Sequence, residues 1–375
     1  MKRRRFVHVI FWIMAIIAAV ITAVFLYLKL YGKNIIEDKL SDVLGRPIKF
    51  KGISLDLDRY SVEFDEFYIP AGGGFRERVV FSSDNLAITL DKEKFRKSRE
   101  VVFELIEVQN AVLHVERNKS GELNIARNRF RSRTGKFPVP GIKSGAYTGS
   151  PAFDNALLYN FTKGFKKLVI RDSVIKFTDY HIYGVPYTLA CDDFNLTLIS
   201  DEMPDFMALS GTLSFKIPVS NYALEGEVLA NISVAVYERM ANMEINLDTG
   251  YIDVMQFQPY FEQYTPFYFK EGLFSSNTKF EIHQNAIRSL TTMAFHRLQL
   301  WLKPGMQNTQ FLNENVNRLV PYLTSRGGDI IFDFTVDGSP ANPQFGLGPK
   351  VKHAITMVAV QEVGKALQHF QNLQK

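Results

Sequence analysis

The chain has a single cysteine, Cys191, among its 375 residues. One cysteine excludes an internal disulfide and a cysteine-based metal site. The seven histidines are scattered, and the sequence holds no Gly-x-Ser-x-Gly elbow, phosphate loop or Gly-x-Gly-x-x-Gly fingerprint. Asp192 and Asp193 are adjacent, so in a strand they would point to opposite faces, and we expect turn residues there. The sequence therefore predicts a protein that is not an enzyme and that uses no metal and no cofactor.

An excess of charge of one sign is also absent. The chain has 44 basic and 39 acidic residues, for a formal net charge of +5, and part of that excess lies in the first five residues, MKRRR. A nucleic-acid-binding domain presents a basic stripe on its folded surface, but beyond the first five residues this sequence has only one short basic run, at residues 127–136. We therefore expect no nucleic-acid partner.

Long uncharged runs are rare, and the one that exists lies at residues 6–28. Its 23 residues would make a helix of about 34 Å at ~1.5 Å per residue, enough for a hydrocarbon core of ~30 Å. A cleaved signal peptide has a shorter apolar region and small residues at its cleavage site, unlike Phe25-Leu26-Tyr27-Leu28. The basic residues before the run favour a cytoplasmic N-terminus. We expect residues 1–29 to be a basic cytoplasmic tip and an uncleaved single-pass anchor in the inner membrane, with the bulk of the chain in the periplasm.

Beyond the run, apolar and polar residues alternate with a period of two, which is typical of strands with one apolar and one polar face. About fifteen to eighteen such runs are separated by Gly, Asn, Asp and Pro turn signals. Clear examples lie at residues 53–57, 112–116, 194–198, 209–217, 243–248 and 329–337. Long helices between the strands are absent, so a doubly wound fold is excluded. Two arrangements remain open: a closed sandwich with a dry core, and a single curled sheet with an accessible apolar face.

Three segments depart from the alternation. Residues 34–44 and 348–375 carry apolar residues at helical spacing, and each of these helices fits either packing on an end of the sheet or contact with a membrane or partner. Residues 127–156 form a basic Gly/Pro/Ser-rich stretch, either a solvated loop or one that touches anionic headgroups. The stretch divides a first strand-rich part, with its leading helix, at residues 30–126 from a second at residues 157–347.

Several segments, in order along the chain, resemble the AsmA-like family. Residues 40–70 resemble its opening helix and strands, and residues 112–126 its strand, turn and Gly-x-x-Asn element, here Gly121 and Asn124. Residues 167–198 resemble its middle strands, including Asp179 of Phe-Thr-Asp-Tyr. Residues 328–345 resemble its closing strand and turn. A further segment carries the family's Pro-Tyr…Pro…Gly pattern at Pro259, Tyr260, Pro266 and Gly272.

This family is similar to TamB and to chorein-type bridge proteins that transfer lipids. The resemblance implies a mainly β fold: a transmembrane helix, then an elongated, curled antiparallel sheet with an apolar groove and short helices at both ends. It implies phospholipids and the inner membrane as partners, and a role in phospholipid transport or outer-membrane homeostasis. An envelope protein partner or a homo-oligomer stays open, as does the alternative of a non-enzymatic assembly factor for outer-membrane proteins. The residues expected to line the groove are Leu55, Leu57, Leu113, Leu196, Leu198, Leu213, Phe215, Ile217, Ile245, Leu247, Ile330, Phe332 and Phe334.

Overall fold

A computed structural model describes residues 33–38, 40–41, 46–125, 159, 161–182, 186–218, 225–237, 241–284, 286–311, 314–316, 329–339 and 342–348. The expected anchor at residues 1–29 and the basic stretch at residues 127–156 lie outside these ranges, as does the expected C-terminal helix apart from Gly348. Within the described ranges, no helix has the length and apolar character needed to cross a membrane.

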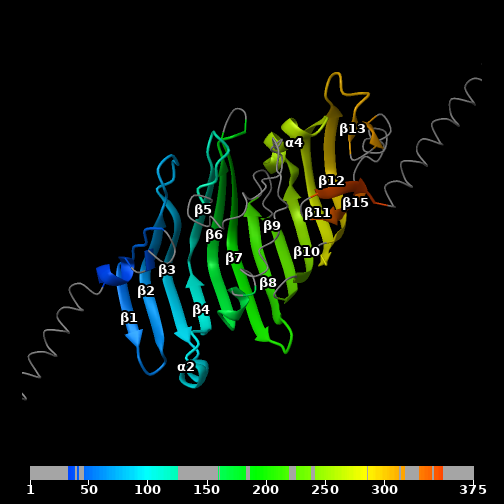
Figure 1. Cartoon of the computed structure of the whole chain (residues 1–375). Coiled ribbons are helices and arrows are strands. Elements are labelled where there is room, and N and C mark those ends of the chain that lie inside the picture. The colour runs from blue at the N-terminus through cyan, green and yellow to red at the C-terminus, as the bar shows by residue number, and fades with distance from the viewer. Residues whose placement is uncertain are drawn as a thin grey trace, which may run out of the picture.

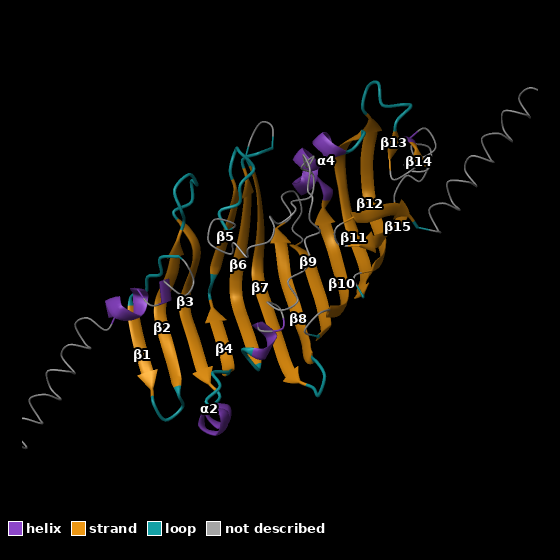
Figure 2. Ribbon diagram, viewed as in Figure 1, coloured by secondary structure: helices purple, strands orange, loops and turns teal. Residues whose placement is uncertain are grey.

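The described residues are mainly β, as the alternation predicts (Figure 2). The strands are β1 (Gly52–Asp56), β2 (Ser61–Pro70), β3 (Val79–Leu90), β4 (Phe103–Gln109), β5 (Val112–Arg117), β6 (Lys167–Asp179), β7 (Tyr187–Glu202), β8 (Met207–Pro218), β9 (Glu225–Val236), β10 (Ala241–Asp253), β11 (Phe267–His283), β12 (Ala286–Leu302), β13 (Gln310–Phe311), β14 (Glu314–Asn315), β15 (Asp329–Ser339) and β16 (Asn342–Leu347). The helices with assigned bounds are α2 (Lys92–Ser98), the 3₁₀ turn η1 (Val254–Phe257) and α4 (Gln258–Tyr264).

A single 14-stranded sheet contains all of these strands except the separate pair β13–β14. Strands follow one another across the sheet almost in chain order, so the colour in Figure 1 runs steadily from one edge to the other. Helix α2 lies beyond one set of strand ends, and α4 lies at the opposite set (Figure 1). The two strand-rich parts expected from the sequence thus share one sheet.

The expectation of a purely antiparallel sheet is wrong at β6, which runs parallel to both β4 and β5. β4 and β5 both pair with β3 and follow each other in the same direction, separated only by Asn110 and Ala111. The chain then returns to the start of β4 before it enters β6, and a parallel pair requires such a crossover. Alternation predicts the face of the sheet on which a side chain lies, but it carries no information about strand direction. The sequence therefore could not predict that β6 runs parallel to β4 and β5.

The register places the apolar residues of successive strands on one face, since residues directly opposite each other share a face. One row runs across four strands through Leu196, Leu213, Ala230 and Leu247. We call this side of the sheet the apolar face, and the opposite side the polar face.

Several long strands contain a residue with positive φ in their interior. These include Asp172 in β6, Asp193 in β7, Tyr251 in β10 and Arg297 in β12. The pairing register shifts beside Asp172, Asp193 and Tyr251. A bulge bends its strand and increases the local twist, so bulges in successive strands bend the whole sheet. The expected turn at Asp192–Asp193 is wrong: these residues lie inside β7, because the αL conformation that Asp tolerates produces a bulge there and the chain does not reverse.

The helix expected at residues 34–44 is present at residues 33–38 and 40–41. Ile36 and Leu40 pack against a buried cluster of Ile48, Phe50, Phe64 and Phe67. The buried Glu37 carboxylate accepts a hydrogen bond from Lys49 Nζ at 2.8 Å and another from the Phe50 amide. Of the two alternatives, the helix therefore packs on an end of the sheet.

Candidate functional site

The register brings nearly all the predicted groove residues onto the apolar face. The residues that hold positions on this face are Leu55, Leu113, Leu196, Leu198, Leu213, Phe215, Ile217, Ile245, Leu247, Ile330 and Phe334. Phe332 lies opposite Met293 of β12 in the register.

Leu57 is the exception, because β1 ends at Asp56. The Asp56 carboxylate accepts hydrogen bonds from the amides of Asp58 and Arg59, both at 2.9 Å. Such bonds are typical of an Asx turn, so the chain reverses before Leu57 can join the strand. Leu57 is 81% exposed in this turn. The prediction of Leu57 as a strand residue is wrong.

Many apolar side chains on this face are only half-buried, including Leu213, Phe215, Ile245 and Leu247. In a sandwich core, facing side chains interdigitate and exclude water. Here, in the described part of the chain, short segments contact the face: the helix at residues 33–41, the turn with Phe165, and η1 with Phe257. The side chains between these contacts keep part of their surface exposed, which is the condition for binding an apolar ligand.

Hydroxyl groups interrupt the apolar face where it crosses β10, β11 and β12. Thr249 and Ser276 are opposite each other and their hydroxyls are 2.8 Å apart, and the Thr278 hydroxyl donates to Thr291 Oγ1 at 3.0 Å. A polar group facing hydrocarbon is tolerated when it is hydrogen-bonded, and these hydroxyls bond to each other. The apolar face is therefore not uniformly apolar, a feature that the sequence did not predict.

Polar side chains also gather at one end of the apolar face, beneath α4. Arg117 of β5, Asp179 of β6 and Tyr187 of β7 lie side by side in the register. Asp179 Oδ2 accepts from Arg117 Nη1 at 3.1 Å and from the Tyr260 hydroxyl at 2.9 Å. The Tyr187 and Tyr260 rings meet edge to face with their centroids 5.0 Å apart. We call Arg117, Asp179, Tyr187 and Tyr260 the rim cluster.

The rim cluster joins segments that are separated across the sheet. Tyr260 belongs to α4, which follows β10, and its bond to Asp179 reaches β6 across β7, β8 and β9. At the other end of α4, Lys303 Nζ donates to the carbonyls of Glu262 and Thr265 at 2.5 and 2.6 Å, a favourable place for a cation. Sequence reasoning noted Asp179 and Tyr260 only through the family motifs, and it missed Arg117 and Tyr187.

Burial governs the electrostatics of the rim cluster. The side chains of Arg117 and Asp179 are 7% and 0% exposed, so their charges balance each other away from water. Burial raises the pKa of Tyr187 well above its ordinary value. Burial also raises the pKa of Tyr260, with a further contribution from its hydrogen bond to Asp179. Both phenol hydroxyls therefore keep their proton at neutral pH and can donate it in a hydrogen bond.

The family-like Gly-x-x-Asn element lies beside the rim cluster and fixes the turn after β5. Gly121 has φ +83°, a conformation that favours glycine. The Asn124 side chain accepts from the Glu116 amide at 2.9 Å and donates to the His114 carbonyl at 2.7 Å. The Glu116 carboxylate in turn accepts from the amides of Arg76 and Glu77. These bonds anchor the β5 end, and with it Arg117.

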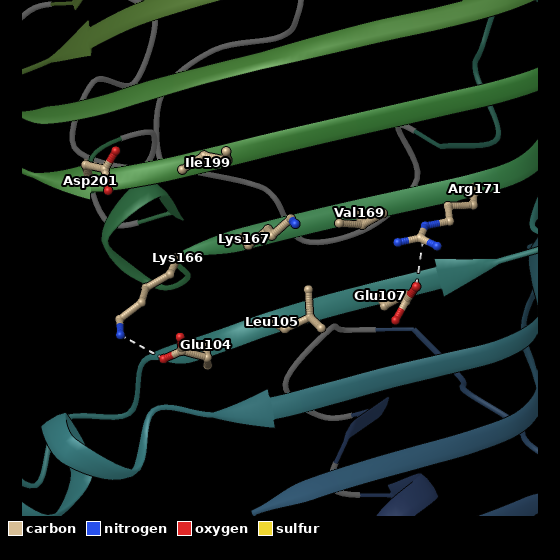
Figure 3. Close-up of a pocket in the computed structure, with 9 residues that line it drawn as sticks. All are labelled: Glu104, Leu105, Glu107, Lys166, Lys167, Val169, Arg171, Ile199 and Asp201. Atoms are coloured by element: carbon tan, nitrogen blue, oxygen red, sulfur yellow. Dashed lines mark hydrogen bonds and ion pairs between the residues drawn. The ribbon is translucent and has the colours of Figure 1, made fainter. Parts of the chain in front are cut away.

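The polar face carries a shallow cavity of about 380 Å³ where β4, β6 and β7 meet (Figure 3). Its apolar lining consists of Leu105, Val169 and Ile199, set among charged residues. Lys166 Nζ lies 2.7 Å from Glu104, and Arg171 Nε lies 3.5 Å from Glu107. These ion pairs balance the charge around the cavity.

The described residues contain no group of three or more side chains suited to hold a metal ion. No family model matches the chain, and no curated protein matches it significantly.

Proposed function

We propose that this protein binds the acyl chains of phospholipids on its apolar face. The observation that supports the proposal is the row of half-buried side chains at Leu196, Leu213 and Leu247, which crosses neighbouring strands on one side of the sheet. Each buried methylene contributes about 0.8 kcal/mol, so an acyl chain along such a wall gains substantial affinity without any catalytic group.

The uncharged run at residues 6–28 supports the second part of the proposal. As a transmembrane anchor it would place the sheet in the periplasm beside the inner membrane, where phospholipid is available. A bound lipid would then shelter its acyl chains from water while its headgroup stays in solvent. In this role the protein contributes to phospholipid transport or outer-membrane homeostasis.

Photocrosslinking in cells tests the proposal on the full-length chain. Benzoylphenylalanine at Ile245 places the probe on the apolar face, and at Asn246 it places the same probe on the polar face of the same strand. Both positions are half-buried, so they form a matched pair. We expect phosphate-labelled phospholipid to crosslink at position 245 and not at position 246.

Each outcome is informative. Equal labelling at the two positions would mean that lipid meets the chain nonspecifically, which contradicts the proposal. Protein adducts at position 245 without lipid would favour the assembly-factor alternative, in which the apolar face docks another polypeptide.

A further inference from the structure

The buried polar side-chain atoms that lack a hydrogen-bond partner in the described part of the chain are Arg117 Nε, Tyr187 Oη and Asp253 Oδ2. Arg117 and Tyr187 flank Asp179 in the register, and Asp253 is the N-cap of η1, which runs directly into α4. The first two atoms thus belong to the rim cluster, and the third belongs to the segment that leads to Tyr260 of that cluster.

Their lack of partners is unusual for a folded protein. The large majority of buried polar atoms are hydrogen-bonded, and leaving one without a partner destabilises the fold. Tyr187 is 8% exposed and Asp253 is 2% exposed. Arg117 Nε and the Tyr187 hydroxyl both lie in the rim cluster, on either side of Asp179, and two such atoms together indicate a site whose ligand supplies the missing partners.

Charge defines the chemistry of that ligand. Arg117 Nε and the Tyr187 hydroxyl are donors, so the ligand must carry acceptors. The Arg117 charge is already balanced by Asp179 at 3.1 Å, so no net positive charge is left to attract an anion, and the Asp179 carboxylate would repel one. A neutral acceptor such as a carbonyl oxygen therefore fits better than a phosphate or a free carboxylate.

The residues around the rim cluster indicate that the ligand also has an apolar part. A buried cluster of Ile217, Val228 and Ile252 lies on the same face, and η1 contributes Phe257 to it. A ligand that follows both surfaces has hydrocarbon next to a carbonyl, which is the structure of an acyl ester.

We propose that the rim cluster is a binding site for the ester carbonyls of a glycerolipid, with Arg117 Nε and the Tyr187 hydroxyl as the donors. This inference rests on the proposed function, because it assigns the polar end of a lipid whose acyl chains lie on the apolar face. The donors are enclosed, so the lipid enters when Tyr260 releases Asp179 and α4 shifts.

A comparison of ester-linked with ether-linked lipid tests the site directly. The full-length chain in detergent receives equal amounts of a diester phosphatidylethanolamine and its dialkyl ether analogue, and native mass spectrometry measures the bound ratio. The two lipids share headgroup and chain length, and only the ester lipid carries the carbonyl acceptors. We expect about a fivefold preference for the ester lipid for each net hydrogen bond, and therefore roughly thirtyfold for the two donors together.

Two variants identify the donors. Tyr187→Phe removes a hydroxyl that has no partner in the fold, so it should leave thermal stability unchanged or slightly higher while the ester preference falls about fivefold. Arg117→Lys keeps the positive charge opposite Asp179 but lacks the Nε donor, so the ester preference should also fall. A purely structural role for Tyr187 would not change the lipid ratio.

The outcomes separate this inference from the proposed function. Equal binding of both lipids by the wild-type chain overturns the ester site and leaves acyl-chain binding in place, as does an ester preference that survives both substitutions. Binding of neither lipid refutes the proposed function itself.

Discussion

Removing the charge of Asp179 should destabilise the rim cluster more than any comparable change at the surface. Asp179 is fully buried and accepts hydrogen bonds from Arg117 Nη1, the Tyr260 hydroxyl and the His181 amide. Asp179→Asn leaves the Arg117 charge buried without a counter-ion, which costs about 3–5 kcal/mol. Tyr260→Phe removes one hydrogen bond and keeps the ion pair, so we expect a smaller loss of about 1.5 kcal/mol.

Hydrogen–deuterium exchange on the full-length chain measures this loss locally. A decrease of about 3–5 kcal/mol in opening free energy accelerates exchange about a hundredfold or more in β5, β6 and α4. The control is Glu104→Gln, which breaks a pair of 2.7 Å whose side chains are 44% and 50% exposed. A loss below about 1 kcal/mol is expected there, although this pair is the shorter one.

The double replacement Arg117→Met with Asp179→Leu completes the test. It removes both charges together and should restore the part of the stability that Asp179→Asn loses through the unpaired Arg117 charge, although the Tyr260 hydroxyl and the His181 amide lose their acceptor. If Asp179→Asn changes exchange no more than Glu104→Gln does, or if the double variant is as unstable as the single one, then burial of the ion pair does not control this end of the sheet.

Three further predictions concern single positions. Burial raises the pKa of Cys191 to about 11, so its alkylation by iodoacetamide should keep accelerating up to that pH, whereas the urea-unfolded chain should level off near pH ~8.5. Gly211→Ala would place a Cβ 2.2 Å from the Thr197 carbonyl oxygen, so we expect a loss of about 1–3 kcal/mol in urea unfolding. Hydrogen bonding from the Lys94 amide lowers the pKa of Asp91, so its stabilisation of α2 should be present above pH ~4 and be lost as the pH falls below that value. Thermal melts across this range should show that loss, and Asp91→Asn, which caps the helix without titrating, should not show it.

Alternation in the sequence predicted the strands and the face of most of their side chains, because a period of two depends only on the local backbone. Bulges limit this prediction, because an αL residue inside a strand changes which of the residues after it point to each face of the sheet. In β7, Cys191 and Leu196 occupy the same face on either side of Asp193, although they are five positions apart. A local pattern cannot separate a bulge from a turn, because the same Asp residues serve both and neighbouring strands determine which one forms.

The sequence could not predict the contacts between distant segments, for a different reason. Tyr260 and Asp179 are 81 positions apart, and their bond depends on how the strands from β6 to β10 are arranged across the sheet. The hydroxyls of Thr249 and Ser276 were also unpredictable as a feature of the apolar face, because Ser and Thr occur on either face of a strand. Only the register showed that they lie among apolar neighbours.

The distribution of buried clusters explains how a broad sheet can be stable and still leave apolar surface accessible. Within the described residues, separate clusters form around Phe64, Met207 and Ile217, and each is covered by a short segment. Stability is then concentrated where those segments pack, and the strands between them depend on ladder hydrogen bonds and half-buried side chains. Ligand-binding regions are drawn from the less stable parts of a fold. Among the described residues, those parts are the stretches of the apolar face that no short segment contacts, so the architecture that leaves them accessible also leaves them free to adjust around an apolar ligand.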